Sequence, residues 1–356
     1  MRRITLIALF WAMTAIAVMA QKPDVEWSVD FKTIFDNREG DETYCKAETF
    51  FMTQLAPEIG LSLNEGRHTL MGGVVWTQPI GCEWDGHKLS PTLYYRYRRE
   101  GTEGWLGMFG RDQLARRLPD YIWNDSCYYV QRNIRGAGIV HRGEHGFVQG
   151  VLDWRGMQTH RQREAFNVIV DGEWRRGSGS VLAAGGTAMM NHLARRKNAP
   201  EGESVVDNFI VNPYIGADLT QKAAWCDTLT VKAGVLASMT RDRAFNHKWV
   251  SRAGAWFEGC LGWRRFSFRE EVYAGGRLFP YYSHYGPVLD QGEPYYASPW
   301  YSRTDVSYAV IRSNHVKLEA SLDFHAAKNN FNFYQRLILQ VMVSTDSRLR
   351  WHWTES

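Results

Sequence analysis

The chain lacks a long apolar run. After its first twenty residues, no stretch of the 356-residue sequence reaches about 18 consecutive apolar residues, and a helix needs about 20 to cross a bilayer. The mature chain is therefore predicted to have no membrane-spanning helix.

Cysteine and net charge are also scarce. The five cysteines include no C-x-x-C pair, so zinc sites and thioredoxin-like chemistry have no support, and no motif for a cofactor or another metal is present. The formal charge of +4 falls to +2 if Arg2 and Arg3 are removed with a leader. This balance gives no argument for a nucleic-acid partner or an acidic substrate.

The first twenty residues resemble a secretory leader. Two arginines precede an apolar stretch at 6–13, and the small residues of Val18-Met19-Ala20 precede Gln21. We expect residues 1–20 to be a signal peptide, and no cysteine follows the cleavage site to carry a lipid anchor. A short first transmembrane helix is the alternative, but the apolar stretch is well below spanning length.

Aromatic residues make up 14% of the chain and there are 32 glycines, a composition that suits strands and tight turns. Between Val316 and His325 apolar and polar residues alternate without interruption. Successive side chains of a strand point to opposite faces, so this stretch predicts a strand with one apolar and one charged face.

The same pattern recurs along the chain and predicts about sixteen strands, within a range of fourteen to eighteen. The candidates are 25–36, 54–63, 68–78, 92–99, 104–110, 133–141, 147–156, 163–174, 180–190, 205–219, 228–240, 249–262, 266–274, 303–311, 316–325 and 333–343. Some alternate poorly: Asp207 shares the face of Phe209 and Val211, and Glu270 shares that of Phe268 and Val272. A bulge at Glu270 could rotate it inward.

The connections between these strands alternate in length. The short ones are 64–66, 100–103, 143–145, 177–179, 264–265 and 313–314, with 220–227 as a longer member. The other class includes 37–49, 79–90, 111–132, 191–204 and 275–302, with shorter members near 157–162, 241–248 and 326–331. Outer-membrane barrels have short periplasmic turns and longer external loops, so residues 21–356 are predicted to form one antiparallel transmembrane β-barrel. The alternative is that this alternation of short and long connections arose by chance.

Several motifs resemble those of uncharacterised outer-membrane β-barrel proteins of gut Bacteroidota. They are Leu55-Ala56-Pro57-Glu58-Ile59-Gly60-Leu61 with Gly66-Arg67-His68, Leu152-Asp153-Trp154-Arg155-Gly156 with Arg163-Glu164-Ala165-Phe166, and Tyr282, Tyr285-Gly286, Tyr296, Trp300-Tyr301 and Arg303-Thr304-Asp305. The resemblance spans most of the mature chain and implies a barrel in the cell outer membrane, but no activity. The segment 348–356 runs past the last predicted strand, whereas barrel chains often end in an aromatic residue.

The polar faces should line the lumen. Eleven acidic and ten basic strand residues are expected there, so the charges nearly cancel and an ion-pair network is favoured over a charge-selective filter. Representative members are Asp153, Arg155, Arg252, Glu258, Lys317, Glu319 and Asp323.

Catalytic residues are not evident. The histidines at 145, 160, 192, 284, 315 and 325 are scattered over turns, loops and strand ends. A set such as Ser283, His284 and Asp290 can be drawn, but triads are defined by geometry, and no sequence context marks a nucleophile. An omptin-like cluster of acids and a histidine is not recognisable either. We therefore expect a non-enzymatic role rather than an enzymatic one.

The segment 279–301 is the richest aromatic loop and contains four prolines. Aromatic faces with hydroxyl groups suit stacking on sugars, which makes this loop a candidate binding surface. The alternatives are a rigid plug folded into the barrel mouth or an interfacial aromatic belt. The residues of the binding hypothesis are Tyr281, Tyr282, Tyr285, Tyr295, Tyr296 and Trp300.

We therefore expect an outer-membrane barrel with a structural, transport-related or surface-exposed role. Its partners would be the lipid bilayer and a glycan or small solute, and a filled lumen should conduct poorly. The rivals are a secreted β-sandwich that binds or cleaves glycans and an outer-membrane hydrolase. Cys45, Cys82 and Cys127 fall in expected external loops, and Cys45–Cys82 is the expected disulfide if one forms.

Overall fold

The computed structural model describes residues 22–177, 179–244 and 247–346. The expected signal peptide and the segment 348–356 lie outside the described residues. Within the described part, no helix is long and apolar enough to cross a membrane.

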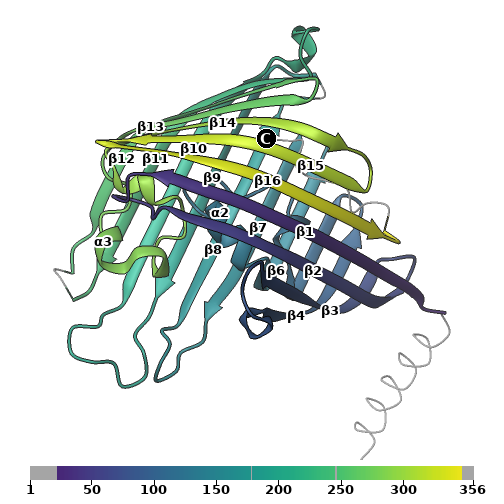
Figure 1. The fold of residues 1–356 in the computed structure, drawn as a ribbon, viewed down its shortest axis with the longest axis horizontal. Coiled ribbons are helices and arrows are strands. Elements are labelled where there is room, and N and C mark those ends of the chain that lie inside the picture. The colour runs from purple at the N-terminus through teal and green to yellow at the C-terminus, as the bar shows by residue number, and fades with distance from the viewer. Residues whose placement is uncertain (1–21, 178, 245–246, 347–356) are drawn as a thin grey trace, which may run out of the picture.

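Sixteen antiparallel strands close into one barrel (Figure 1). They are β1 (Asp24–Gly40), β2 (Glu48–Leu63), β3 (His68–Pro79), β4 (Lys88–Arg99), β5 (Thr102–Gly110), β6 (Asn133–Gly143), β7 (Gly146–Gly156), β8 (Ala165–Arg175), β9 (Leu182–Leu193), β10 (Val206–Asp218), β11 (Thr228–Asp242), β12 (Val250–Trp263), β13 (Phe266–Gly275), β14 (Trp300–Arg312), β15 (Val316–Ala327) and β16 (Asn330–Ser344). Each predicted strand is present, and the closed barrel excludes the β-sandwich alternative.

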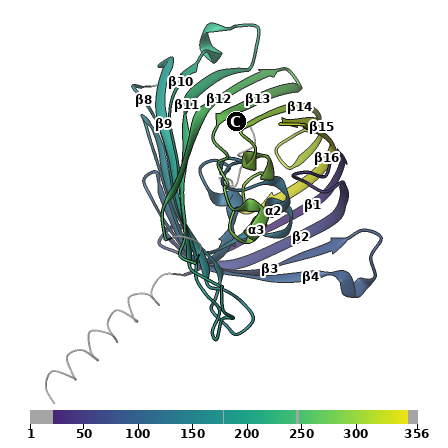
Figure 2. The same ribbon diagram turned by 90° about the vertical axis from the view of Figure 1, so that its left-hand side faces the viewer.

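Closure comes from the pairing of β1 with β16, which runs from Ser28 opposite Ser344 to Gly40 opposite Asn332. Figure 2 looks toward one end of the barrel and shows the wall encircling helical segments. The alternation that predicted β15 is the reason it fits the wall, because Leu322 is exposed on the outside whereas Asp323 and His325 are buried inside. The outer surface is strongly apolar, with Leu182 and Ile215 each 71% exposed.

Two details of the strands differ from the sequence prediction. β2 begins at Glu48 rather than at 54, and the added residues pair with β1, where Glu48 stands opposite Arg38. No register shift occurs at Glu270, which stays on the outer face. There it accepts hydrogen bonds from Ser302 Oγ at 2.7 Å and Thr304 Oγ1 at 2.5 Å. Two hydroxyl groups on β14, rather than a bulge, therefore satisfy this outward carboxylate.

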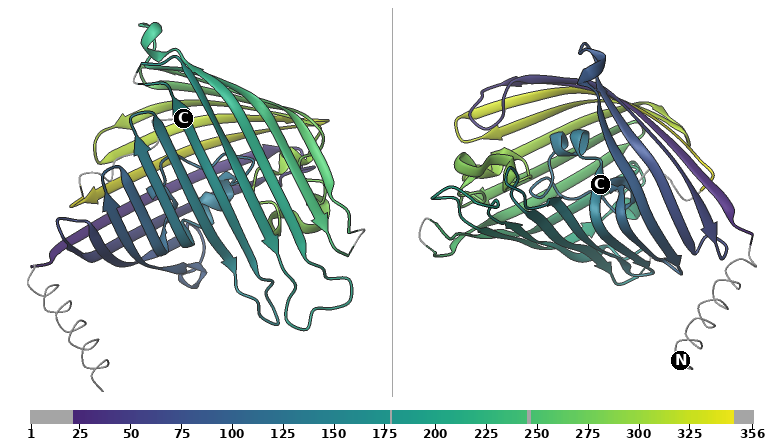
Figure 3. Two further views of the ribbon diagram at one scale, coloured as in Figure 1. Left: turned by 180° about the vertical axis from the view of Figure 1, so that it is seen from behind. Right: turned by 90° about the horizontal axis from the view of Figure 1, so that it is seen from below.

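Connections of different length gather at opposite ends of the barrel, as predicted. At the short-turn end, β4 and β5 are joined by residues 100–101 and β12 and β13 by 264–265. At the long-loop end, the longest connections are 111–132 and 276–299. Figure 3 shows the barrel from behind and from below, with hairpins extending past the rim.

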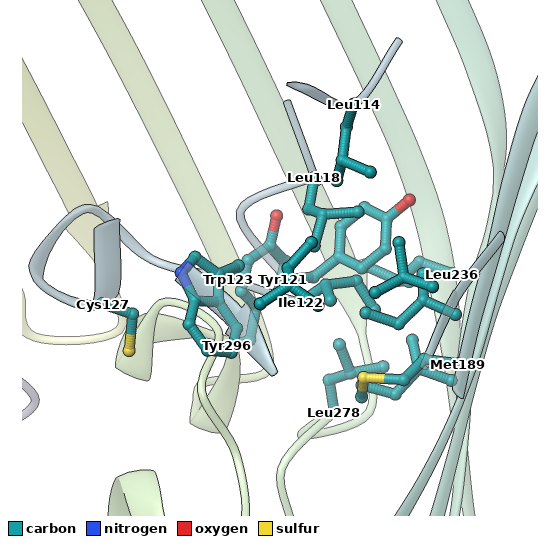
Figure 4. Packing of buried hydrophobic residues seen from close by; sticks show 14 of the residues in the cluster. Leu114, Leu118, Tyr121, Ile122, Trp123, Cys127, Met189, Leu236, Leu278 and Tyr296 are labelled. Atoms are coloured by element: carbon teal, nitrogen blue, oxygen red, sulfur yellow. The ribbon is translucent and has the colours of Figure 1, made fainter. Parts of the chain in front are cut away.

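The two longest connections fold into the barrel, and we call 111–132 the first lumenal segment and 276–299 the second lumenal segment. They contain η2 (Arg111–Gln113), α2 (Asp125–Val130), α3 (Tyr282–Tyr285), η4 (Gly286–Val288) and η5 (Pro294–Ala297); η1 (Trp84–Gly86) and η3 (Thr220–Lys222) lie in other connections. The sequence placed the first segment outside the barrel, which was wrong. Its apolar residues pack against the wall at Met189 and Leu236, and against Leu278 and Tyr296 of the second segment (Figure 4).

The core of this protein is therefore the contact between these segments and the wall. Trp123 of the first segment has no exposed surface, and Arg111 lies 3.6 Å from its ring centroid. Leu278 carbonyl oxygen accepts a 2.6 Å hydrogen bond from Ser238 on β11. Burial of aromatic side chains contributes strongly to packing, so both segments are held as parts of the fold rather than as loose loops.

All five cysteines are free. Cys127 lies in α2 inside the barrel rather than in an external loop, and the expected Cys45–Cys82 bond is not formed. The first lumenal segment carries Cys127 away from the rim because its apolar residues pack into the lumen.

Candidate functional site

The lumen holds a dense ion-pair network, as expected from its nearly cancelling charges. Asp153 pairs with Arg111, and Lys317 lies 2.9 Å from Glu319. Glu258 lies 3.3 Å from Lys232. The Arg111–Asp153 pair joins a lumenal segment to the wall and the Lys232–Glu258 pair crosses between two strands, which indicates a structural role for them, whereas Lys317 and Glu319 lie on the same strand.

The remaining predicted lumen charges divide between the interior and the rim. Asp323 is fully buried and pairs with Arg303 and Arg336. Arg155 donates to the Val288 carbonyl and to Asn191. Arg252 is exposed near the long-loop end, so it does not belong to the buried network.

The two lumenal segments also bind each other. The backbone amide of Glu293 donates to the Asp120 carbonyl at 2.7 Å, and that of Asn124 donates to the Gln291 carbonyl at 2.9 Å. Burial opposes the ionisation of Asp120, but the guanidinium groups of Arg303 and Arg269 outweigh it and lower its pKa to about 2. The segments therefore form one unit with a charged anchor on the wall.

Two acids of the second lumenal segment have a raised pKa, in contrast to the lowered pKa of Asp120. Burial raises the pKa of Asp290 to about 7, although the positive charge of the nearby Arg155 acts to lower it. Burial likewise raises the pKa of Glu293 to about 7, against that of Arg303. Asp290 accepts a 2.8 Å hydrogen bond from Asn208, so a neutral carboxyl fits this interior.

The aromatic residues proposed for binding are mostly occupied by packing. Tyr295 and Tyr296 have no exposed surface. The ring centroids of Tyr282 and Phe279 lie 6.1 Å apart, and the Tyr285 hydroxyl donates to Asp242. Tyr281 is partly buried, and Trp300 is exposed at the start of β14. The second lumenal segment thus lies inside the barrel, as in the alternative of a plug folded into the barrel mouth. Little of its aromatic surface is left for a ligand.

The histidines sit in different surroundings. His325 is buried, and its Nδ1 lies 2.7 Å from the Tyr301 hydroxyl. Ser283 and His284 are exposed while Asp290 is buried, so these three do not share one surface. His145, His160 and His315 lie in turns or loops. The burial of His325 keeps this imidazole from acting as a base that a substrate could reach.

His192 differs, because its Nδ1 lies 2.9 Å from Asp207 Oδ1. Both residues face outward, since their neighbours Leu193, Val206 and Asn208 are buried inside the barrel. The pair is set by the strand register, in which Asp207 of β10 stands opposite His192 of β9. His192 is the last but one residue of its strand, so the pair lies near the long-loop rim.

Two arginines complete the polar part of this site. Arg241 Nη2 donates to Asp207 Oδ2 at 2.8 Å, and Arg243 Nη2 donates to the same oxygen at 2.9 Å. The side chain of Asp207 is 12% exposed and that of His192 is 26% exposed. The carboxylate is thus covered by its partners, while the imidazole keeps an open edge.

Aromatic side chains flank the polar groups on the outer wall. Register pairs place Trp154, Phe166, His192, Asp207 and Arg241 side by side across five strands, β7 to β11. We call these five residues the outer-wall row. Phe166 stacks on Trp154 with centroids 5.1 Å apart and lies 5.2 Å from the His192 ring. Such aromatic residues are typical of the level at which a barrel meets lipid headgroups.

The row has the parts of an acid–base site. A carboxylate bonded to Nδ1 fixes the tautomer of a neutral imidazole, which leaves the Nε2 lone pair to accept a proton. The sequence contained a signal for this site in Asp207, an acid on an apolar strand face. It could not show the partner, because His192 lies on another strand. In the described residues, no group of three or more His, Cys, Asp or Glu is arranged to hold a metal ion.

Comparison with solved structures identifies the fold. The chain matches OccK1 (OpdK) of Pseudomonas aeruginosa with a TM-score of 0.52 and 11% identity, over 90% of this chain and 99% of that one. It matches OprD of the same organism with a TM-score of 0.52 and 9% identity, over 90% and 96%. A third match is OccK2 (OpdF) in complex with glucuronate, with a TM-score of 0.50 and 8% identity, over 90% and 98%. The fold is therefore that of outer-membrane porins.

Comparison by sequence gives a different kind of relative. No functionally curated protein matches the chain. A family model described as lipid A 3′-O-deacylase-type matches residues 19–348.

Proposed function

The chain belongs to the lipid A 3′-O-deacylase-type family, and we propose that it hydrolyses an ester-linked acyl chain of lipid A in the outer leaflet of the outer membrane. The observation that carries this proposal is the His192–Asp207 pair on the lipid-facing wall. It favours the hydrolase alternative over a transport role for the same barrel.

The position of the pair suits a lipid substrate. Long loops are external in outer-membrane barrels, so the rim that carries His192 lies at the outer leaflet. Acyl esters lie at the boundary between headgroups and hydrocarbon, which is the level marked by Trp154 and Phe166. The two lumenal segments bind each other and the wall across the barrel, so an acyl chain would reach a reactive group from the outer wall.

The chemistry needs one water molecule and no covalent intermediate. His192 Nε2 would take a proton from water while the oxygen attacks the ester carbonyl carbon. The bond between the carbonyl carbon and the sugar oxygen of the resulting tetrahedral intermediate would then break, and the sugar oxygen would take the proton back from the imidazolium. The products are the free sugar hydroxyl and the fatty acid. Asp207 would hold the ring and stabilise the imidazolium during the reaction.

Arg241 and Arg243 would act by position and charge. They hold Asp207 ionised and in place through bonds of 2.8 Å and 2.9 Å. Their guanidinium groups, whose side chains are 30% and 46% exposed, would also attract the phosphate groups of lipid A to this part of the rim.

The test is mass spectrometry of lipid A from outer membranes that contain the wild-type protein, His192→Gln or Asp207→Asn. We expect the wild type to remove one acyl chain and both variants to lower the rate by about 10²–10⁴-fold, the usual contribution of a general base. His68→Gln is the matched control, because His68 also lies on the outer wall, beside Tyr95, but at the short-turn end. Full activity of His192→Gln in a correctly folded barrel would refute the assignment.

A further inference from the structure

A cavity of about 800 Å³ lies at the long-loop end of the barrel, between β2, β3 and β4 on one side and the chain that leads from the first lumenal segment into β6 on the other. Its lining residues lie within 49–54, 75–82, 88–91 and 130–135, together with Met108. We call it the notch pocket, because the wall is interrupted beside it. It has no part in the proposed hydrolysis, whose residues lie on β9 to β11.

The interruption comes from the shortness of β5. β4 begins at Lys88, but its pairing with β5 begins only where Leu93 stands opposite Met108. β5 ends at Gly110, where the chain turns into the first lumenal segment, so residues 88–92 have no strand beside them on that side. The hairpin of β3 and β4 accordingly projects beyond its neighbours (Figure 2). Neighbouring strands lie about 4.8 Å apart, so the backbones of β4 and β6 are roughly 10 Å apart at the notch.

The sequence is adapted to this free edge. Pro91 has no N–H group to donate to a neighbouring strand, and proline in a sheet is typical of an edge. The side chain of Asn133 on β6 reaches β4, where its Nδ2 donates to the Pro91 carbonyl at 3.2 Å and to Thr92 Oγ1 at 2.8 Å. These bonds close the base of the notch and leave the part beside residues 88–90 open.

The pocket extends from the inner side of the wall to the lipid side. Met52 and Val75 line it from within the barrel and are buried. Leu89 and Met108 line it from the outer face, on which Leu89 is 61% exposed and Leu93 is also exposed. Since the outer face of β4 stays apolar as far as Leu89, the notch opens into the hydrocarbon of the outer leaflet.

One apolar side chain inside the barrel is left uncovered at this pocket. Val130, the last residue of α2, is 46% exposed, whereas the neighbouring Tyr129 is buried. Phe51 and Ile80 add further exposed apolar surface to the lining. Exposed apolar surface in a concave site indicates an apolar occupant, and the volume lies within the range of about 300–1,000 Å³ found for small-molecule sites.

The charges at the notch pocket have one sign. Within the described residues, no Asp or Glu belongs to the lining, and its cations are Lys88, Arg132 and Arg135. Arg132 is already neutralised, because it lies 3.0 Å from Asp30 and 2.9 Å from Asp112. Lys88 and Arg135 are exposed, and neither has an ion-pair partner in the part of the chain that the structure describes. They lie near the starts of β4 and β6, on the two sides of the notch, and suit one negative charge there.

We propose that the notch pocket binds one long-chain fatty acid from the outer leaflet. Its chain would pass through the notch onto Met52 and Val75, and its carboxylate would be held by Lys88 and Arg135. Because the chain is surrounded by hydrocarbon both in the bilayer and in the pocket, the two cations rather than burial select the ligand. This site lies on other strands than the outer-wall row and does not depend on hydrolysis.

The test is photo-crosslinking of the full barrel in lipid nanodiscs at pH 8, with palmitic acid that carries a diazirine in the middle of its chain. We expect crosslinks at Met52 and Val75, located by mass spectrometry, because a lipid outside the wall does not reach these inward residues. Unlabelled palmitate should compete, and hexadecanol should compete about tenfold less, as expected for the loss of one charge. Crosslinks on outward residues alone, or equal competition by the alcohol, would overturn the proposal.

A variant that fills the pocket tests the path of the chain. Val130→Trp places a large side chain at an exposed position, so the barrel should still fold while the crosslinks at Met52 disappear. Val288→Trp is the matched control, because Val288 is an exposed valine of the second lumenal segment that does not line the pocket. It should leave the crosslinks unchanged. No loss in Val130→Trp, or an equal loss in both variants, would refute the notch pocket as the site.

A charge variant tests the binding of the head group. Lys88→Gln should raise the palmitate concentration needed for half-maximal competition by about tenfold. Arg99→Gln removes an exposed cation from the opposite end of the same strand and should have no effect. Equal competition in these two variants would show that Lys88 does not hold the carboxylate.

Discussion

Arg303 Nη1 on β14 donates a 3.0 Å hydrogen bond to a carboxylate oxygen of Asp120 in the first lumenal segment. The same guanidinium donates to Asp125 at 3.0 Å and lies 3.6 Å from Glu293 in the second segment. One buried side chain of the wall thus contacts both segments that fill the lumen. The interior is held by a charged centre as well as by apolar packing.

Replacing Arg303 should lower the stability of the folded barrel. Arg303→Met leaves Asp120 and Asp125 with fewer buried partners, and breaking a buried ion pair costs about 3–5 kcal/mol. We expect a lower temperature for the change in gel mobility between folded and unfolded barrel. The exposed residue Arg135 provides a control, since Arg135→Gln should change stability by less than about 0.5 kcal/mol. A similar unfolding temperature for Arg303→Met and wild type would contradict the anchor role.

The second lumenal segment should pack less firmly as pH rises. Burial raises the pKa of Asp290 to about 7 in the fold, above its ordinary value of about 3.8. For an acid whose pKa is raised by folding, the unfolded state loses its proton first. The contribution of Asp290 to stability is therefore highest below about pH 4 and declines until the folded carboxyl has ionised near pH 7. Glu293, also raised to about 7, adds to the same trend.

Hydrogen exchange of residues 286–293 at pH 5 and pH 8, corrected for intrinsic rates, measures this effect. We expect faster opening at pH 8. Asp290→Asn keeps the shape and the contact with Asn208 but cannot ionise, so its pH dependence should be smaller than that of the wild type. Equal slopes for the two proteins would show that Asp290 does not control the packing.

The strands could be predicted because their signal is local. In β15, the alternation of Leu322 and Asp323 is sufficient to show which side faces lipid. The first lumenal segment could not be placed in this way, because Leu114 and Leu118 find their partners on distant strands. The outer-wall site was missed for the same reason: it requires the register of β9 against β10, and the sequence shows His192 and Asp207 only as separate residues.

Thiol labelling should report the orientation of the barrel. Cys82 is exposed in the β3–β4 connection at the long-loop end, whereas Cys127 is buried in the lumen. Burial also raises the pKa of Cys127 to about 12, which lowers its reactivity further. In intact cells, a membrane-impermeant maleimide should therefore modify Cys82 and leave Cys127 unmodified. Cys82→Ser supplies the control, and protection of Cys82 until the outer membrane is opened would reverse the assigned orientation.

The conductance of the barrel should depend on both lumenal segments. A sixteen-stranded barrel can leave an aqueous channel, yet here two segments bind each other and the wall across that space. We expect the wild type to show low conductance in planar bilayers. Deleting residues 281–299 should raise it only in part, because the first segment keeps its contact between Asp120 and Arg303. Deleting residues 113–130 as well should produce large, steady openings, since the apolar cluster and its charged anchor are then both gone. Large openings in the wild type that the first deletion leaves unchanged would show that neither segment obstructs the lumen.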